Sequence, residues 1–239
     1  MPKMKKRKMI LIATCIIIAV VLALIVILWP RAIKFELHSY EFVESPMPPP
    51  YGVSLMMRYN TTGDVEVHLY DPTGKEIVSN YLAENTQECI MGLNFTPQAG
   101  VYTLVIKPWF GEETVFQKYL SFSGYNLSVA SFTPTWSYYS NYLCYDLSGF
   151  TLEVRNDGDL PVEPYIADVT IGGKTENYYR LQVEWVMPNQ KKSVPSLPLI
   201  KFTPERALVS GVSYQASVRV KDFNGNILAT YSTSVIVSA

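Results

Sequence analysis

Residues 65–70 read Val65-Glu66-Val67-His68-Leu69-Tyr70, so apolar and polar side chains alternate along this stretch. Successive side chains of a β-strand point to opposite faces of its sheet, and this alternation therefore predicts a half-buried strand. Residues 34–40 and 102–106 alternate in the same way, and no stretch from residue 33 onward shows a convincing helical period of 3.6 residues. The pattern predicts an all-β body.

Turn residues divide this body into two series of strands. About seven short runs lie in residues 33–123, and seven more lie in residues 124–239. Seven strands at a spacing of 8–12 residues are typical of a β-sandwich. We expect two tandem sandwiches with a boundary near Ser123-Gly124 and no long linker, so that the sandwiches touch. The second series is expected at residues 127–132, 150–154, 165–171, 179–185, 192–194, 213–220 and 227–237.

Three sequences in the second series predict hairpin turns: Asn156-Asp157-Gly158, Gly172-Gly173 and Asn224-Gly225. Asn and Gly tolerate the positive φ angles of a type I′ turn, which makes Asn-Gly between alternating runs a strong hairpin signal.

An uncharged segment precedes the strands. Residues 9–29 read MILIATCIIIAVVLALIVILW, and a helix of this length spans about 31 Å, which matches a hydrocarbon core of about 30 Å. Five basic residues lie within positions 3–8, so the positive-inside rule places residues 1–8 in the cytoplasm and the body outside. The sequence predicts a single-pass cell-membrane protein with a signal-anchor helix at residues 9–29 and the lipid bilayer as a partner.

Two other interpretations of this segment fit less well. A cleavable signal peptide has a shorter apolar region and ends in small residues, whereas this segment ends in Trp29-Pro30. A lipoprotein would turn polar after Cys15, but fourteen apolar residues follow it. We therefore expect the anchor to stay uncleaved.

The charge of the body excludes one class of partner. Residues 1–31 hold six of the 20 Lys and Arg residues and none of the 21 Asp and Glu residues, so the rest carries a formal charge of −7. Nucleic-acid binding requires a basic surface, and we expect no nucleic-acid partner.

The stretch Leu152-Glu153-Val154-Arg155-Asn156-Asp157-Gly158-Asp159-Leu160-Pro161-Val162, followed by residues 167–173, resembles CARDB-like modules. These are adhesion-type, immunoglobulin-like modules of archaeal and bacterial surface proteins, and residues 187–194 resemble their proline turn. The resemblance covers residues 124–239, and the first sandwich resembles this class more loosely. It implies immunoglobulin-like sandwiches that act as spacers or interaction modules, without chemistry of their own. An aromatic insert at residues 133–147 departs from the family pattern.

Candidate catalytic groups are few. His38 follows Glu36 and His68 follows Glu66 by two residues, so each pair shares a strand face and can be an acid–base site or simply a solvated face. No nucleophile elbow, zinc-protease motif, phosphate loop or dinucleotide fingerprint occurs. We expect no enzyme, no catalytic residue, no cofactor and no metal.

Two clusters of oxygen-bearing side chains could bind calcium, but both are explained as turns. They are Asn156, Asp157 and Asp159, and Asp222, Asn224 and Asn226.

The cysteines leave two possibilities. Cys89 and Cys144 can form a disulfide that joins the first sandwich to the aromatic insert, or they can be two separately buried thiols. The chain has no Cys-x-x-Cys motif that would indicate zinc.

Three glycosylation acceptors begin at Asn60, Asn94 and Asn126. They agree with an extracellular address.

The aromatic insert is the most unusual stretch. It holds Trp136, Tyr138, Tyr139, Tyr142 and Tyr145, with Ser and Asn between them. Such a composition is typical of contact surfaces, and the rings can also stack on sugars or close the joint between the sandwiches.

These features predict a structural or interaction module with a protein partner in the membrane or cell envelope, or a surface adhesion module. A glycan- or solute-binding ectodomain that uses residues 133–147 is the alternative. A third is a hydrolase with a carboxylate site among Glu36, Glu66, Asp146 and Asp168.

Overall fold

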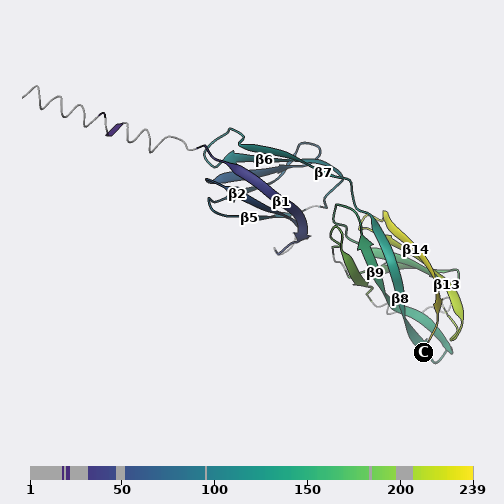
Figure 1. The fold of residues 1–239 in the computed structure, drawn as a ribbon. Helices are drawn as coiled ribbons and strands as arrows, with labels where there is room; N and C mark the ends of the chain where they lie inside the picture. Colours follow the sequence, from purple (N-terminus) through teal and green to yellow (C-terminus); the bar gives the residue numbers. More distant parts are fainter. Residues whose placement is uncertain are drawn as a thin grey trace, which may run out of the picture. The chain divides into compact units, whose positions relative to one another are not determined.

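The computed structural model describes residues 18, 20–21, 32–46, 52–94, 96–182, 185–197 and 207–238, with the side chains of 175–178 left out. The chain divides into two units, Met1–Lys34 and Phe35–Ala239, and all the strands that the structure describes lie in the second unit. The regular structure described in that unit is β-strand, as Figure 1 shows. The prediction of an all-β body is confirmed.

Fourteen strands are described. They are β1 (Phe35–Glu44), β2 (Val53–Thr61), β3 (Val65–Tyr70), β4 (Glu76–Leu82), β5 (Glu88–Leu93), β6 (Gly100–Pro108), β7 (Phe116–Phe122), β8 (Leu127–Tyr139), β9 (Cys144–Asn156), β10 (Ile166–Ile171), β11 (Lys174–Arg180), β12 (Lys191–Pro195), β13 (Ser213–Lys221) and β14 (Ile227–Ile236).

The two series of strands have the same topology. β1–β7 form the sheets β1-β2-β5 and β4-β3-β6-β7, and β8–β14 form β8-β9-β12 and β11-β10-β13-β14. All the paired strands are antiparallel. Seven strands split between two antiparallel sheets form an immunoglobulin-like sandwich, here with the fourth strand beside the third. The strands of the two series are separated by residues 123–126, which we call the linker.

Alternating side chains build both cores, as the strand pattern requires. Val65, Val67 and Leu69 of β3 are buried, and Leu152 and Val154 of β9 are buried in the second sandwich. Burial of such apolar surface is the main favourable term in folding.

The three predicted turns have different outcomes. Gly172 (φ 58°) and Gly173 (φ 79°) confirm a two-residue turn with positive φ at both positions. The β13–β14 turn is longer than predicted: the Gly225 N–H donates to the Asp222 carbonyl, and the positive φ falls on Gly225. The hairpin predicted at residues 156–158 is wrong, because β9 and β10 lie in different sheets and residues 157–165 cross between them.

The predicted anchor at residues 9–29 and the tail at residues 1–8 lie outside the described residues, apart from Ile18, Val20 and Val21, which have helical geometry. The part of the chain that the structure describes contains no helix of the length and apolarity that a membrane span requires.

Candidate functional site

The aromatic stretch continues two strands and forms no loop insert. β8 and β9 are 13 residues each and pair as far as Tyr139 opposite Cys144, with a turn at residues 140–143. At about 3.3 Å per residue, β8 carries Tyr139 roughly 40 Å from Leu127 beside the linker. The expectation that these aromatics close the joint between the sandwiches is therefore wrong.

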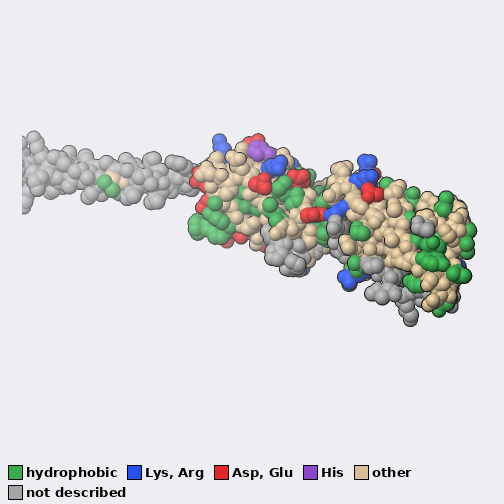
Figure 2. Space-filling model, turned by 90° about the horizontal axis from the view of Figure 1, so that it is seen from below, with side chains coloured by type: hydrophobic (Ala, Val, Ile, Leu, Met, Phe, Trp, Pro, Cys, Tyr) green, Lys and Arg blue, Asp and Glu red, His purple; other side chains and the backbone are tan. Residues whose placement is uncertain are grey.

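We call residues 136–145, at the far end of this hairpin, the aromatic tip. Tyr142 is 60% exposed and Leu143 is 80% exposed, while Tyr138 stacks at a tilt on Tyr145 with ring centroids 5.0 Å apart. Figure 2 shows hydrophobic side chains gathered at the end of the second sandwich farthest from the linker. The tip contains no charged residue. It presents apolar and aromatic surface to solvent.

The predicted tip residues do not all face solvent. Trp136 and Tyr145 pack against the core of the second sandwich, whereas Tyr138 and Tyr142 are exposed. Leu143, which the sequence reasoning missed, has φ 49°. A left-handed backbone costs a non-glycine residue about 1 kcal/mol or more, and such strain concentrates at functional positions.

A second cluster holds the linker. The Asn156 side chain is fully buried and makes four hydrogen bonds: Nδ2 donates to the carbonyls of Leu160 (2.7 Å) and Val186 (3.0 Å), and Oδ1 accepts from the N–H groups of Asn126 (3.1 Å) and Gly158 (3.0 Å). All donors and acceptors of this amide are satisfied.

Backbone bonds complete this arrangement. The N–H groups of Asp157 and Asp159 donate to the carbonyls of Asn126 and Gly124, each at 3.0 Å. We call residues 156–159 the linker clamp. It explains the Asn-x-Gly sequence, whose composition predicts a hairpin turn instead.

Asp159 adds a charge to the clamp. Its carboxylate accepts from the N–H groups of Ser123 (2.8 Å) and Gly124 (2.8 Å). Partial burial by itself raises the pKa of Asp159, but these hydrogen bonds outweigh burial and hold the pKa below its usual value.

Replacing Asp159 by asparagine is expected to lower the free energy of unfolding by about 1–2 kcal/mol at pH 7, a value reduced for partial solvent exposure. A depressed pKa contributes stability above the unfolded value of about 3.9, and this is lost as pH falls through the lower folded value. Urea unfolding at pH 7 and pH 2 tests the prediction, with the exposed Asp157→Asn as control. If Asp159→Asn lowered the free energy of unfolding by the same amount at both pH values, the prediction would be contradicted.

The residues of the two calcium clusters are engaged separately. Asp157 pairs with Arg155 at 2.6 Å, Asp159 binds the linker, and both oxygens of Asp222 accept from Asn226. Within the residues that the structure describes, no group of His, Cys, Asp or Glu has the arrangement of a metal site.

The two histidines differ. His38 is exposed, 3.9 Å from Glu36, so its strand face is solvated. His68 is only 9% exposed, with Nδ1 3.2 Å from Glu76 Oε2 and Nε2 3.6 Å from Glu66 Oε2. The solvated interpretation is wrong for His68, because the β3–β4 register places Glu76 opposite Tyr70 and beside the ring.

The carboxylates of the hydrolase alternative are not brought together. Glu36 and Glu66 belong to the first sandwich, and Asp146 and Asp168 belong to the second. Asp168 is buried and paired with Lys221 at 2.6 Å.

Cys89 and Cys144 are free and buried. Cys89 lies in β5 and accepts a hydrogen bond from Asn80 Nδ2 (3.4 Å), whereas Cys144 begins β9 in the other sandwich, at the aromatic tip. The disulfide considered from the sequence is therefore not formed. Burial raises the pKa of the Cys89 thiol, which disfavours the reactive thiolate.

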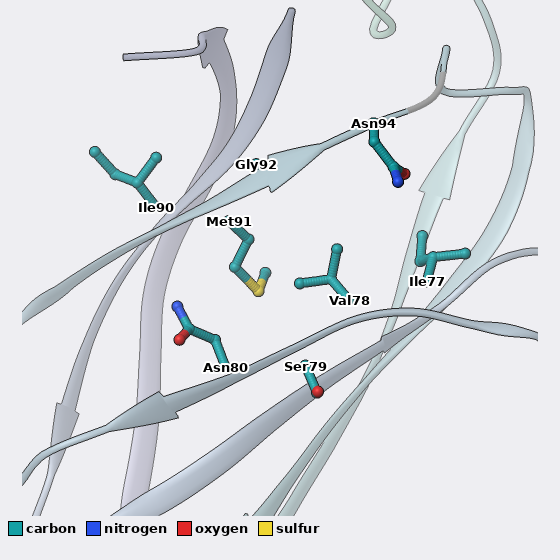
Figure 3. Close-up of a pocket in the computed structure, with 8 residues that line it drawn as sticks. All are labelled: Ile77, Val78, Ser79, Asn80, Ile90, Met91, Gly92 and Asn94. Atoms are coloured by element: carbon teal, nitrogen blue, oxygen red, sulfur yellow. The ribbon is translucent and has the colours of Figure 1, made fainter. Parts of the chain in front are cut away.

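A cleft of about 350 Å³ opens between the edge strands β4 and β5. Figure 3 shows Val78 and Met91 facing each other across it, with Asn94 at one end. No lining residue is titratable, so the cleft has no acid or base of its own.

The three predicted glycosylation acceptors, Asn60, Asn94 and Asn126, are all exposed. Their glycosylation stays a prediction.

No family model matches this sequence. No curated protein matches it either. Among solved structures, a two-domain fibronectin type III segment of chicken tenascin aligns with 84% of this chain and 99% of its own, at 14% identity and a TM-score of 0.33. The YadV chaperone aligns with 86% of this chain and 100% of its own, at 11% identity and a TM-score of 0.24.

The Amycolatopsis orientalis exo-chitosanase CsxA aligns with 77% of this chain, at 12% identity and a TM-score of 0.24, and the alignment covers 25% of the enzyme. At these identities and scores the likenesses carry no conclusion about function. The specific resemblance to CARDB-like modules stays a prediction.

Proposed function

We propose that this chain is a non-enzymatic, membrane-anchored, extracytoplasmic protein that binds a partner protein of the membrane or cell envelope through its aromatic tip. The observation that carries the proposal is Leu143, an apolar residue that is 80% exposed in a left-handed conformation at the end of a long hairpin. Folding alone gives no reason to keep a strained leucine in water.

The chemistry of the tip favours a protein partner. Interface cores are rich in tyrosine and tryptophan and poor in charge, and the tip shares both properties. Leu208 pairs with Tyr145 of the tip through two backbone hydrogen bonds. This pairing brings the next residue, the exposed Val209, beside the tip, where it adds apolar surface.

The anchor at residues 9–29 and the CARDB-like assignment of residues 124–239 belong to this proposal. The glycan alternative keeps one supporting observation, the exposed ring of Tyr138 beside Tyr145.

Leu143→Gly is expected to weaken partner binding by about 30-fold, the effect of a hot spot of about 2 kcal/mol. The same change is expected to raise the unfolding temperature, because glycine relieves the strain at φ 49°. The measurements are stoichiometric co-purification of the full chain in detergent and thermal unfolding. A purely structural role for Leu143 would not give opposite signs.

Tyr119→Ser, which removes an exposed tyrosine from β7, is the matched control and should retain the partner. A wild-type chain that runs as a lone monomer would contradict the proposal. Retention on cell-wall polysaccharide that is lost in Tyr142→Ala, without a protein partner, would favour the glycan alternative. Tyr142 is the better test residue, because Trp136 also supports the core.

A further inference from the structure

A cavity of about 340 Å³ opens at the linker end of the second sandwich. Its walls are the linker, the β9–β10 crossover and the β13–β14 turn, and residues 96–99 border it. Its lining includes Tyr125, Glu163, Asp222, Phe223 and Leu228. This volume is within the range of small-ligand pockets.

Glu163 is the distinctive group of this cavity. Its side chain is half-buried, and within the described part of the chain it has no hydrogen-bond or ion-pair partner. The lining contains no Lys, Arg or His, and the other acid, Asp222, is occupied by Asn226. Burial raises the pKa of the Glu163 carboxyl, because nothing in the cavity compensates its charge.

Aromatic rings line the same cavity as this carboxylate. Phe223 is 71% exposed and contacts Tyr165 edge-on, with ring centroids 5.1 Å apart. Tyr125 is also exposed, and Leu228, which is only partly buried, supplies apolar surface to the cavity. Ring faces attract cations, and a carboxylate among such rings complements an ammonium group on an apolar arm.

We propose that this cavity binds a primary ammonium group carried by a peptide, either a lysine side chain or an amino-terminal residue. Glu163 forms the ion pair, Phe223 and Tyr125 face the cation, and the apolar surface receives the arm. The site lies at the linker, at the opposite end of the second sandwich from the aromatic tip. Failure of one proposal therefore does not imply failure of the other.

Three probes test the site with the full chain in detergent micelles, by saturation-transfer NMR. Nα-acetyl-lysine methylamide carries a side-chain ammonium, norleucine amide carries an α-ammonium, and Nα-acetyl-norleucine methylamide carries neither. We expect binding of one or both amines and at least about tenfold weaker binding of the neutral probe, equivalent to about 1.4 kcal/mol. The preferred amine identifies the source of the ammonium group.

Glu163→Gln should weaken amine binding by about tenfold, whereas Glu112→Gln, in the β6–β7 loop, should leave it unchanged. Amine binding should also fall as pH is lowered through the raised pKa of Glu163. Equal binding of the neutral probe, absence of amine binding, or full binding by a folded Glu163→Gln variant would each overturn the proposal.

Discussion

Asn156→Ala is expected to lower the free energy of unfolding of the second sandwich by about 3–5 kcal/mol, near the upper end for a single substitution. The amide makes four hydrogen bonds to backbone groups from a fully buried position. Truncation removes the side-chain bonds of the Leu160 carbonyl and the Gly158 N–H, and an unsatisfied buried group costs about 1–3 kcal/mol. The Val186 carbonyl loses one of its two bonds and keeps the one from the Val162 N–H. The linker loses the bond to the Asn126 N–H at the same time.

Asn156→Asp separates hydrogen bonding from volume. It keeps the shape and the acceptor, but it places a carboxylate oxygen against two carbonyls in place of an N–H donor. We expect a loss as large as that of alanine at pH 7, with partial recovery at low pH as protonation restores a donor. Urea unfolding measures both variants, and the exposed Asn141→Ala is the control. A loss below about 1 kcal/mol for both variants would show that the amide bonds contribute little.

Gly158→Ala is expected to destabilise the second sandwich by about 3 kcal/mol or more, through collision alone. A Cβ atom at this position would lie 2.3 Å from the Gly124 carbonyl oxygen, 2.6 Å from the Asn126 nitrogen and 2.6 Å from the Tyr125 Cα. All three are backbone atoms of the linker, and a rotamer change cannot relieve the contact. The linker or the crossover must move, which breaks hydrogen bonds of the linker clamp.

Thermal unfolding of the full chain measures this effect. Gly111→Ala is the matched control, because the three atoms nearest its added Cβ belong to the Pro108 side chain, the closest at 3.2 Å, and none is a backbone atom. Near-wild-type stability of Gly158→Ala would mean that the linker can withdraw from the crossover, and the clamp would then not be rigid.

The alternation of apolar and polar side chains predicts most of the strands, because it identifies the side chains that face a core. The strand expected at residues 213–220 is observed as β13, Ser213–Lys221, and that expected at 227–237 as β14, Ile227–Ile236. The strand expected at 179–185 lies instead at Lys174–Arg180, directly after the Gly172-Gly173 turn. A two-residue turn fixes where the next strand begins, and this constraint outweighed the apolar pattern farther along.

Two errors have a common cause. Local composition predicts an insert at residues 133–147 and a hairpin turn at residues 156–158, and it does not register which distant segments each one meets. Tyr, Trp and Thr favour strands, so the aromatic stretch could have been predicted as an extension of β8 and β9. The role of Asn156 could not have been predicted, because its partners Val186 and Asn126 are each 30 residues away in sequence.

The candidate sites were only partly visible in the sequence. The aromatic composition identified the tip, but the exposed Leu143 depends on a backbone angle that no motif records. The buried state of His68 required Glu76 from the neighbouring strand, and the cavity around Glu163 is assembled from four separate segments. Such features arise from the register of strands and the approach of loops.

The linker clamp has an evolutionary consequence. Its side chains come from the downstream sandwich, and they contact the linker mainly through backbone atoms, with one further hydrogen bond from the Ser123 side chain to Asp159. The joint therefore places few demands on linker composition beyond Gly124, whose φ of 131° favours glycine, and the Ser123 side chain, which bonds Asp159. A module that carries its own coupling can be duplicated, or recombined behind a different domain, without new compensating mutations upstream. The shared strand order of the two sandwiches is what a chain that grew by such additions would retain.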